Sequence, residues 1–140
     1  MEYRRFGDTY VARMDPGEEV LEQMERAAKA AGVKTASVSA IGAVNDFTVG
    51  LYSVEEKRYF PNRFTGAFEI VSLIGSITQM NGEYYAHLHL AAADGEGKTY
   101  GGHLNRAVIS VTCEMFLTEL DGVIDREKVP ETGINIFRFA

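Results

Sequence analysis

The sequence predicts an α+β fold in which one principal amphipathic helix packs on a mostly antiparallel β-sheet. Only the segment 16–31 repeats its apolar residues at helical spacing. Most of the remaining chain alternates apolar and polar residues, and turn-forming residues divide it. A chain of 140 residues has the length of a single domain, so we expect residues 1–140 to form one.

The helix is expected over residues 16–31. Pro16 suits the first helical position, with Asp15 before it as the N-cap and Glu18 completing a pattern like a capping box. Gly32 supplies the C-terminal stop. The apolar stripe that should face the sheet consists of Val20, Leu21, Met24, Ala27, Ala28 and Ala31.

Strands make up the rest of the predicted structure. Turn-forming residues at Asn45-Asp46, Asn81-Gly82 and 94–97 separate several of them. The polar segment 121–132 is expected to be a loop. The predicted strands are 9–14, 33–44, 47–53, 58–64, 67–78, 83–93, 98–103, 108–120 and 134–139.

The strand predicted over 108–120 holds a carboxylate in apolar surroundings. Glu114 lies opposite the core-facing side, and burying a carboxylate is costly unless it is paired or bound to a metal. Glu114 therefore lies on a solvent or subunit surface, which we favour, or it serves a metal site. The side expected to face the core consists of Ile109, Val111, Cys113, Met115 and Leu117.

Composition and charge exclude several classes of protein. The formal net charge of −6 opposes binding to phosphate backbones and to acidic membranes. Cys113 is the only cysteine, so a disulfide-stapled secreted fold is excluded, and we expect this thiol to be a small buried hydrophobe. No signal peptide is visible, and no apolar run approaches the roughly 20 residues of a membrane span. We expect a cytoplasmic protein without a membrane partner.

All three histidines fall within one short stretch. His87 and His89 point the same way if their segment is a strand, and His103 follows two glycines in the next predicted strand. Three imidazoles with an open or water-filled position form many zinc sites. The pattern predicts a site for zinc or a similar divalent transition metal. In the alternative, His87 and His89 line a polar face and His103 is an unrelated turn residue.

This metal site sets a condition on the connection between the two strands. His89 and His103 face each other only if the connection from Asp94 to Lys98 has an odd number of residues, as a three-residue loop over 95–97 provides. Tyr85, on the same strand face by alternation, and Glu114 are the candidates for a fourth ligand or for a group that orients a bound water.

Three stretches, in this order, resemble the PPC (plant and prokaryote conserved) domain family: 66–75 (GAFEIVSLIG), 87–89 (HLH) and 101–104 (GGHL). The early segments 16–19 (PGEE) and 39–43 (SAIGA) add to the resemblance. It implies a compact α+β domain that assembles as a homotrimer. It also implies that the positions matching the family's histidine motif, His87, His89 and His103, are metal ligands. Stand-alone prokaryotic members are commonly described as predicted DNA-binding proteins.

The chain departs from the plant members of that family in two places. It has no Arg-Gly-Arg-Pro core of an AT-hook, and Ala67 stands where the plant-like motif has an arginine. Arg58 and Arg63 remain the candidates for nucleic-acid contact because they alternate with aromatic residues, although scattered surface charge also explains them. Both departures argue against direct DNA binding.

Two functions are consistent with these features. We favour a stand-alone, homotrimeric binding or regulatory module that contacts itself, protein partners and at most weakly DNA, and that contains the three-histidine metal site. This function fits the absence of a complete catalytic motif and of a phosphate-binding loop. The alternative is a small zinc-dependent enzyme in which the metal lowers the pKa of a bound water to near 7.

Overall fold

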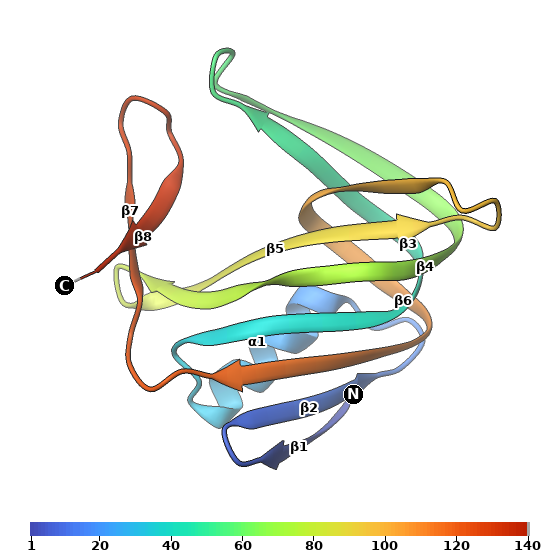
Figure 1. Ribbon diagram of the computed structural model, residues 1–140, viewed down its shortest axis with the longest axis horizontal. Helices are drawn as coiled ribbons and strands as arrows, with labels where there is room; N and C mark the ends of the chain where they lie inside the picture. The colour runs from blue at the N-terminus through green and yellow to red at the C-terminus, as the bar shows by residue number, and fades with distance from the viewer. Residues whose placement is uncertain (140) are drawn as a thin grey trace.

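The computed structural model describes residues 1–139 and confirms the α+β class (Figure 1). One helix, α1 (Val20–Ala31), packs behind a six-stranded antiparallel sheet, and two short strands form a separate hairpin. At 12 residues α1 is too short to cross a membrane, as is any other helical segment within residues 1–139. The strands are β1 (Glu2–Phe6), β2 (Thr9–Met14), β3 (Ala36–Ser53), β4 (Arg58–Met80), β5 (Glu83–Ala93), β6 (Thr99–Glu119), β7 (Asp125–Lys128) and β8 (Asn135–Arg138).

The sheet closes on itself through β6. The strand order is β1-β2-β6-β3-β4-β5, and the N-terminal part of β6 also pairs with β5. Residues 47–53 of β3 and 58–64 of β4 extend beyond the sheet as a long two-stranded arm (Figure 1). The β7–β8 hairpin lies across from this arm, at the other end of β5 (Figure 1). Between the arm and the hairpin lies the outer face of β5.

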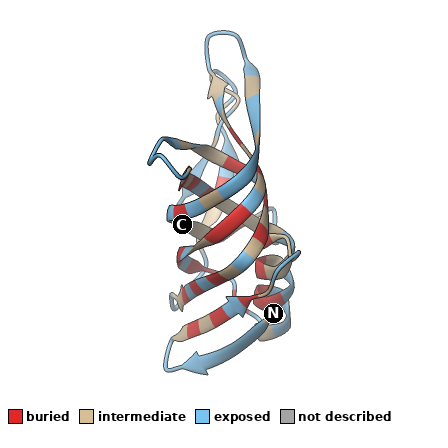
Figure 2. Cartoon of the chain, turned by 90° about the vertical axis from the view of Figure 1, so that its right-hand side faces the viewer, coloured by how far each residue is buried: buried red, intermediate tan, exposed pale blue. Residues whose placement is uncertain are grey.

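The core fills the space between α1 and the inner face of the sheet. Buried and exposed residues alternate along the strands (Figure 2), as expected for a sheet with one covered face. Met24 of α1 and Phe47 of β3 are fully buried. The opposite, outer face of the sheet has no covering helix, and it exposes large apolar side chains: Ile41, Val71, Ile74, Val111 and Phe116.

The helix begins four residues later than predicted, at Val20, with Glu19 as its N-cap. The Glu19 carboxylate accepts a hydrogen bond from the Glu22 amide at 2.8 Å. The predicted start forms a turn instead, because Gly17 adopts a left-handed φ of 85° and its amide donates to the Ile109 carbonyl. The C-terminal prediction is confirmed, since Gly32 has a φ of 73° and closes the helix through the Ala28 and Lys29 carbonyls.

Several predicted breaks between strands are wrong because bulges keep the strands continuous. The expected turn at Asn45-Asp46 is a register shift inside β3, and the gaps at 65–66 and 104–107 lie inside β4 and β6. The strand β1 was not predicted. The prediction of a loop over 121–132 is wrong at β7, because a four-residue charged strand has no apolar alternation to reveal it.

The prediction that Val111 faces the core is wrong. Between Ile109 and Cys113, β6 has two more residues than the paired stretch of β3 between Val44 and Gly42, and this bulge leaves Val111 65% exposed. The other four predicted core residues of the strand are buried. Burial raises the pKa of the Cys113 thiol to about 12, which fits its expected role as a small hydrophobe.

Candidate metal centre

The β5–β6 hairpin brings two of the histidines face to face. Its loop spans 95–97, with Gly97 in the left-handed region at a φ of 80°. The Asp94 amide donates to the Lys98 carbonyl at 2.9 Å and closes the loop. The connection 94–98 therefore has the predicted odd number of residues, and His89 stands directly opposite His103 in the register.

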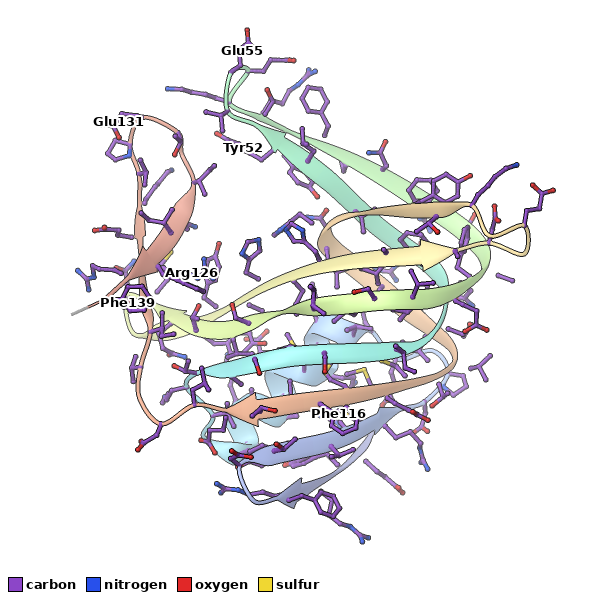
Figure 3. The ribbon with its side chains drawn as sticks, viewed as in Figure 1. Tyr52, Glu55, Phe116, Arg126, Glu131 and Phe139 are labelled. Atoms are coloured by element: carbon purple, nitrogen blue, oxygen red, sulfur yellow. The ribbon has the colours of Figure 1, made fainter. Side chains whose placement is uncertain are left out.

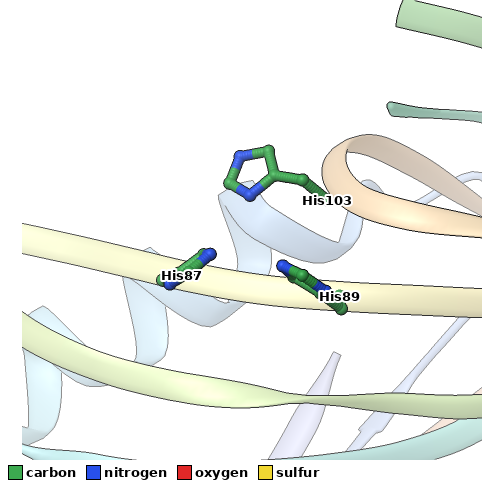
Figure 4. Close-up of side chains that lie close together, drawn as sticks. All are labelled: His87, His89 and His103. Atoms are coloured by element: carbon green, nitrogen blue, oxygen red, sulfur yellow. The ribbon is translucent and has the colours of Figure 1, made fainter. Parts of the chain in front are cut away.

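All three imidazoles gather on the outer face of the sheet (Figure 4). The ring centroids lie 5.2 Å apart for His87 and His89, 5.1 Å for His87 and His103, and 5.8 Å for His89 and His103. One ring nitrogen from each lies within 4.8 Å of the other two. Zinc bonds of about 2.0–2.1 Å require only a modest further convergence of these atoms. The arrangement can hold a metal ion.

Burial keeps the histidines ready to act as ligands. Desolvation, followed by the positive charges of His103, Arg126 and His89, lowers the pKa of His87 to about 4. Burial, with a smaller contribution from His89, also lowers the pKa of His103. Both imidazoles are therefore neutral at pH 7, and a metal ligand must be neutral to offer its lone pair.

Close approach of the strands fixes the positions of the rings. A Cβ atom at Gly75 would lie 2.0 Å from the His87 carbonyl oxygen, so β4 can meet β5 here only with glycine. On the other side, the Tyr59 hydroxyl donates to the His103 carbonyl at 3.1 Å, and its ring packs edge-on against the His103 ring. Asn105 also accepts from this hydroxyl.

The two candidates for a fourth ligand lie in different places. Tyr85 is on the same face of β5 as His87, and its hydroxyl accepts a hydrogen bond from the Asn135 side chain at 3.2 Å. Glu114 is exposed on the outer face, where it lines two shallow hollows together with Phe116. Within residues 1–139, no carboxylate or thiol joins the three histidines to form a larger ligand group.

Arg126 lies beside the histidines and was not predicted from the sequence. Arg126 comes from β7 and is 4% exposed (Figure 3). Its guanidinium stacks on the Tyr85 ring, 4.6 Å from the ring centroid. The local sequence DREK resembles an ordinary charged surface run, so nothing in it signals a buried arginine.

The two candidate nucleic-acid contacts both have acidic partners within the chain. Arg63 forms two hydrogen bonds with Asp46, each of 2.9 Å, and Arg106 adds a third at 2.8 Å. These cations hold the pKa of Asp46 at about 2. Arg58 lies over the Phe60 ring, 3.5 Å from a Glu56 oxygen.

The histidines lie at the end of a row of side chains that crosses the outer face. Each member of this row is the register partner of the next, and the row runs through β2, β6, β3, β4, β5 and again β6. Its members, in this order, are Val11, Phe116, Ser39, Ile74, His89 and His103. Ile74 is 57% exposed and Phe116 is 47% exposed. The candidate metal centre is therefore continuous with the exposed apolar face of the sheet.

A family model described as the Plants and Prokaryotes Conserved (PCC) domain matches residues 1–121 of this chain. Among curated proteins, the bifunctional protein GlmU of Synechococcus sp. (strain JA-3-3Ab) is 33% identical over 127 residues, which are 89% of this chain. The chain spans 19% of the length of that relative.

Solved structures share both the fold and part of the sequence. A protein from Bacteroides thetaiotaomicron, provisionally described as DNA-binding, is 27% identical, with a TM-score of 0.96 over 99% of this chain and 96% of that chain. A metal-containing protein from Archaeoglobus fulgidus is 30% identical, with a TM-score of 0.88 over 99% and 97%. A plant- and prokaryote-conserved (PPC) protein from Pyrococcus horikoshii is 31% identical, with a TM-score of 0.87 over 99% and 94%.

Proposed function

The chain belongs to the Plants and Prokaryotes Conserved (PCC) domain family, and from this premise we propose a homotrimeric binding or regulatory module that contains a metal centre. The metal is zinc or a similar divalent transition metal, held by His87, His89 and His103. The observation that supports the centre best is the convergence of three imidazole nitrogens within 4.8 Å from two strands of fixed register. The likeness to the metal-containing Archaeoglobus protein adds support.

Elemental analysis of the purified, untagged protein tests the metal centre. We expect about one zinc-like ion per chain in the unaltered protein, and its loss from His103→Ala, because two imidazoles bind far more weakly than three. Glu55→Gln, at the tip of the β3–β4 arm (Figure 3), is the matched control and should keep the metal. An unchanged metal content in His103→Ala would contradict the proposal.

The outer face of the sheet supports the homotrimer. It exposes five large apolar side chains, and exposed patches of this kind mark interaction surfaces. A closed cyclic assembly would cover the patch on every copy at once. Phe116 is one of these five side chains and lines a shallow hollow on this face. Phe68 instead packs against Phe47 inside its own subunit, with the ring centroids 5.1 Å apart, and is not available for this interface.

Partners other than a second copy are part of the same proposal. We propose that the chain binds protein partners and binds DNA at most weakly. The chain has a formal charge of −6, and Arg58 and Arg63 already have acidic partners. A cytoplasmic location also belongs to the proposal, and it is supported by the lone, buried Cys113 thiol, which needs no oxidising compartment.

A small zinc-dependent enzyme is the second candidate function. It is favoured by the absence, within residues 1–139, of a fourth Asp, Glu, Cys or His at the centre, because three protein ligands leave a position for water. Hydrolysis of 4-nitrophenyl acetate by the zinc-loaded protein, compared with His103→Ala, separates the two functions. A rate that rises through pH 7 and depends on His103 would favour the enzyme.

A further inference from the structure

Arg126 is the one charged residue among the buried residues of the described chain 1–139. Its guanidinium lies against two aromatic rings, 4.6 Å from the Tyr85 centroid and 4.5 Å from the Phe137 centroid. The rings offset part of the cost of removing the charge from water. They do not neutralise it.

All hydrogen-bond partners of this guanidinium are neutral oxygens. Nε donates to Thr78 Oγ1 at 2.8 Å, Nη1 to the Asn135 carbonyl at 3.1 Å and Nη2 to Ser76 Oγ at 3.5 Å. Of its five N–H donors, these bonds use three. No carboxylate of residues 1–139 forms an ion pair with it, and the adjacent Asp125 pairs with Arg138 at 2.6 Å. A buried charge without a counter-charge is costly.

The unpaired charge lies beside the metal centre. Ser76, which receives the Nη2 bond, is the register partner of His87 across β4 and β5. Side chains opposite each other in this way have Cβ atoms about 4.5–5.5 Å apart. Tyr85, on which the guanidinium stacks, precedes His87 by two residues on the same face.

The centre therefore gathers positive charge without an acidic group to balance it. A divalent metal on three neutral imidazoles retains its full charge, and Arg126 adds one more. In zinc sites with three protein ligands the fourth position is open to water or substrate. A ligand that fills this position and balances the charge must be an anion.

We propose that Arg126 makes the metal centre a receptor for a small oxyanion, with one oxygen on the metal and a second on the guanidinium. This inference rests on the proposed metal centre and specifies the chemistry of its ligand. Carboxylates and inorganic phosphate share this chemistry, because both can present one oxygen to the metal and another to the guanidinium.

The oxyanion subsite is supplied by a segment outside the family match. The family model ends at residue 121, whereas β7 spans Asp125–Lys128. The hairpin also meets the β3–β4 arm, because a Cβ at Gly133 would lie 2.8 Å from the Tyr52 hydroxyl. At the base of the hairpin the Gln79 amide of β4 donates to the Ile124 carbonyl at 3.0 Å, so the segment that contains Arg126 is anchored at both ends.

The test uses the full chain loaded with cobalt(II), whose visible spectrum reports on ligands at the metal. Acetate, oxalate and inorganic phosphate are titrated separately, and imidazole serves as a neutral ligand. We expect oxyanions to perturb the spectrum of the unaltered protein, and Arg126→Gln to weaken their binding about tenfold or more, a change of about 1.4 kcal/mol. Imidazole affinity should change by less than about twofold, because a neutral ligand does not need the guanidinium.

Two further variants separate the Arg126 guanidinium from the general charge of its hairpin. Lys128→Gln removes an exposed cation of β7 and leaves Arg126 in place, so oxyanion affinity should remain close to that of the unaltered protein. Arg126→Lys keeps the charge without the two-donor fork, and its oxyanion affinity should fall several-fold with imidazole unchanged. This variant provides the test if Arg126→Gln does not fold, as judged by circular dichroism.

Each outcome has a distinct meaning. Preference for acetate and oxalate assigns the site to organic acids, and preference for phosphate assigns it to phosphoryl groups. The inference is overturned if no oxyanion perturbs the cobalt spectrum, or if the folded Arg126 variants bind oxyanions as tightly as the unaltered protein. Failure of the unaltered protein to bind cobalt would instead refute the proposed metal centre.

Discussion

His89 and His103 are register partners across the β5–β6 pair, and their ring centroids lie 5.8 Å apart. The five residues 94–98 connect the two strands, and the pairing of His103 with Gly50 of β3 fixes the same face of β6 from its other side. Since side chains alternate across a strand, a register shift of one residue would turn His103 to the opposite face of the sheet. The candidate metal centre thus depends on the pairing of β6 with two neighbouring strands.

Deletion of Glu96 should leave metal binding intact. A four-residue connection can still join Ala93 to Thr99, and register partners of an antiparallel pair lie on the same face of the sheet, so His103 stays beside His87 and His89. The pairing of His103 with Gly50 of β3 holds β6 in the same orientation. Insertion of two glycines after Gly95 lengthens the same loop and should also retain the metal. Elemental analysis of both proteins checks the prediction, which fails if either variant loses its metal.

Metal removal should lower the thermal stability of the protein. An ion that binds only the folded state at 100 times its Kd stabilises that state by about 2.7 kcal/mol, or roughly 5–10 °C in Tm for a domain of this size. We expect EDTA to lower the Tm of the unaltered protein by this amount and to leave the Tm of His87→Ala unchanged. Equal shifts in the two proteins would place the metal elsewhere.

Asp46 should stabilise the protein at neutral pH and lose this effect in acid. The guanidinium groups of Arg63 and Arg106 hold its folded-state pKa at about 2, below the ordinary value of 3.8. Its contribution is therefore complete above about pH 4 and disappears as the pH falls through 2. Asp46→Asn should cost about 1 kcal/mol at pH 6 and almost nothing near pH 2, because partly exposed pairs are screened.

Thermal melts of Asp46→Asn between pH 2 and pH 6 measure this dependence. Asp121→Asn serves as the control, since Asp121 is exposed and forms no ion pair within residues 1–139. A Tm difference for Asp46→Asn that stays constant over the whole range would refute the assignment.

The assembly should be a trimer that depends on Phe116. Light scattering at micromolar concentration should give about three times the 15.5 kDa chain mass. Phe116→Glu places a charge within the apolar face and should yield monomers. Val123→Glu alters an apolar position outside that face, one that is 65% exposed, and should remain trimeric. A monomeric unaltered protein would rule out the subunit interface.

DNA should bind weakly, without sequence preference and with steep loss of affinity as salt rises. We expect no retardation of random or A·T-rich duplex at physiological salt in a gel-shift assay. The reason is the net charge of −6 on each chain, together with the acidic partners of Arg58 and Arg63. Tight binding under these conditions, abolished by Arg58→Ala with Arg63→Ala, would show that both arginines contact DNA.

The helix and the strand 108–120 show where local patterns fail. The capping pattern at Asp15 and Glu18 is real, since the Asp15 amide donates to the Glu18 carboxylate at 2.8 Å. It closes a turn instead of a helix, because this segment pairs with Ile109 of β6. Val111 faces outward because it lies in a bulge of β6 against β3, while Ile109 and Cys113 on either side of it stay buried. Both departures are set by pairing between segments about 70 to 90 residues apart in the chain.

The histidine cluster could be predicted from the sequence because it depends on residues that are close together in the chain. His87 and His89 share a face through the two-residue period of a strand, and an odd loop with a left-handed Gly97 places His103 opposite them. The burial of Arg126 could not be predicted in this way. Its neighbours Tyr85, Thr78 and Ser76 lie about 40–50 residues earlier in the chain, and only the docking of the β7–β8 hairpin on β4 and β5 brings them together. The position of the three histidines follows from short-range periodicity, whereas the position of the charge beside them follows from long-range packing.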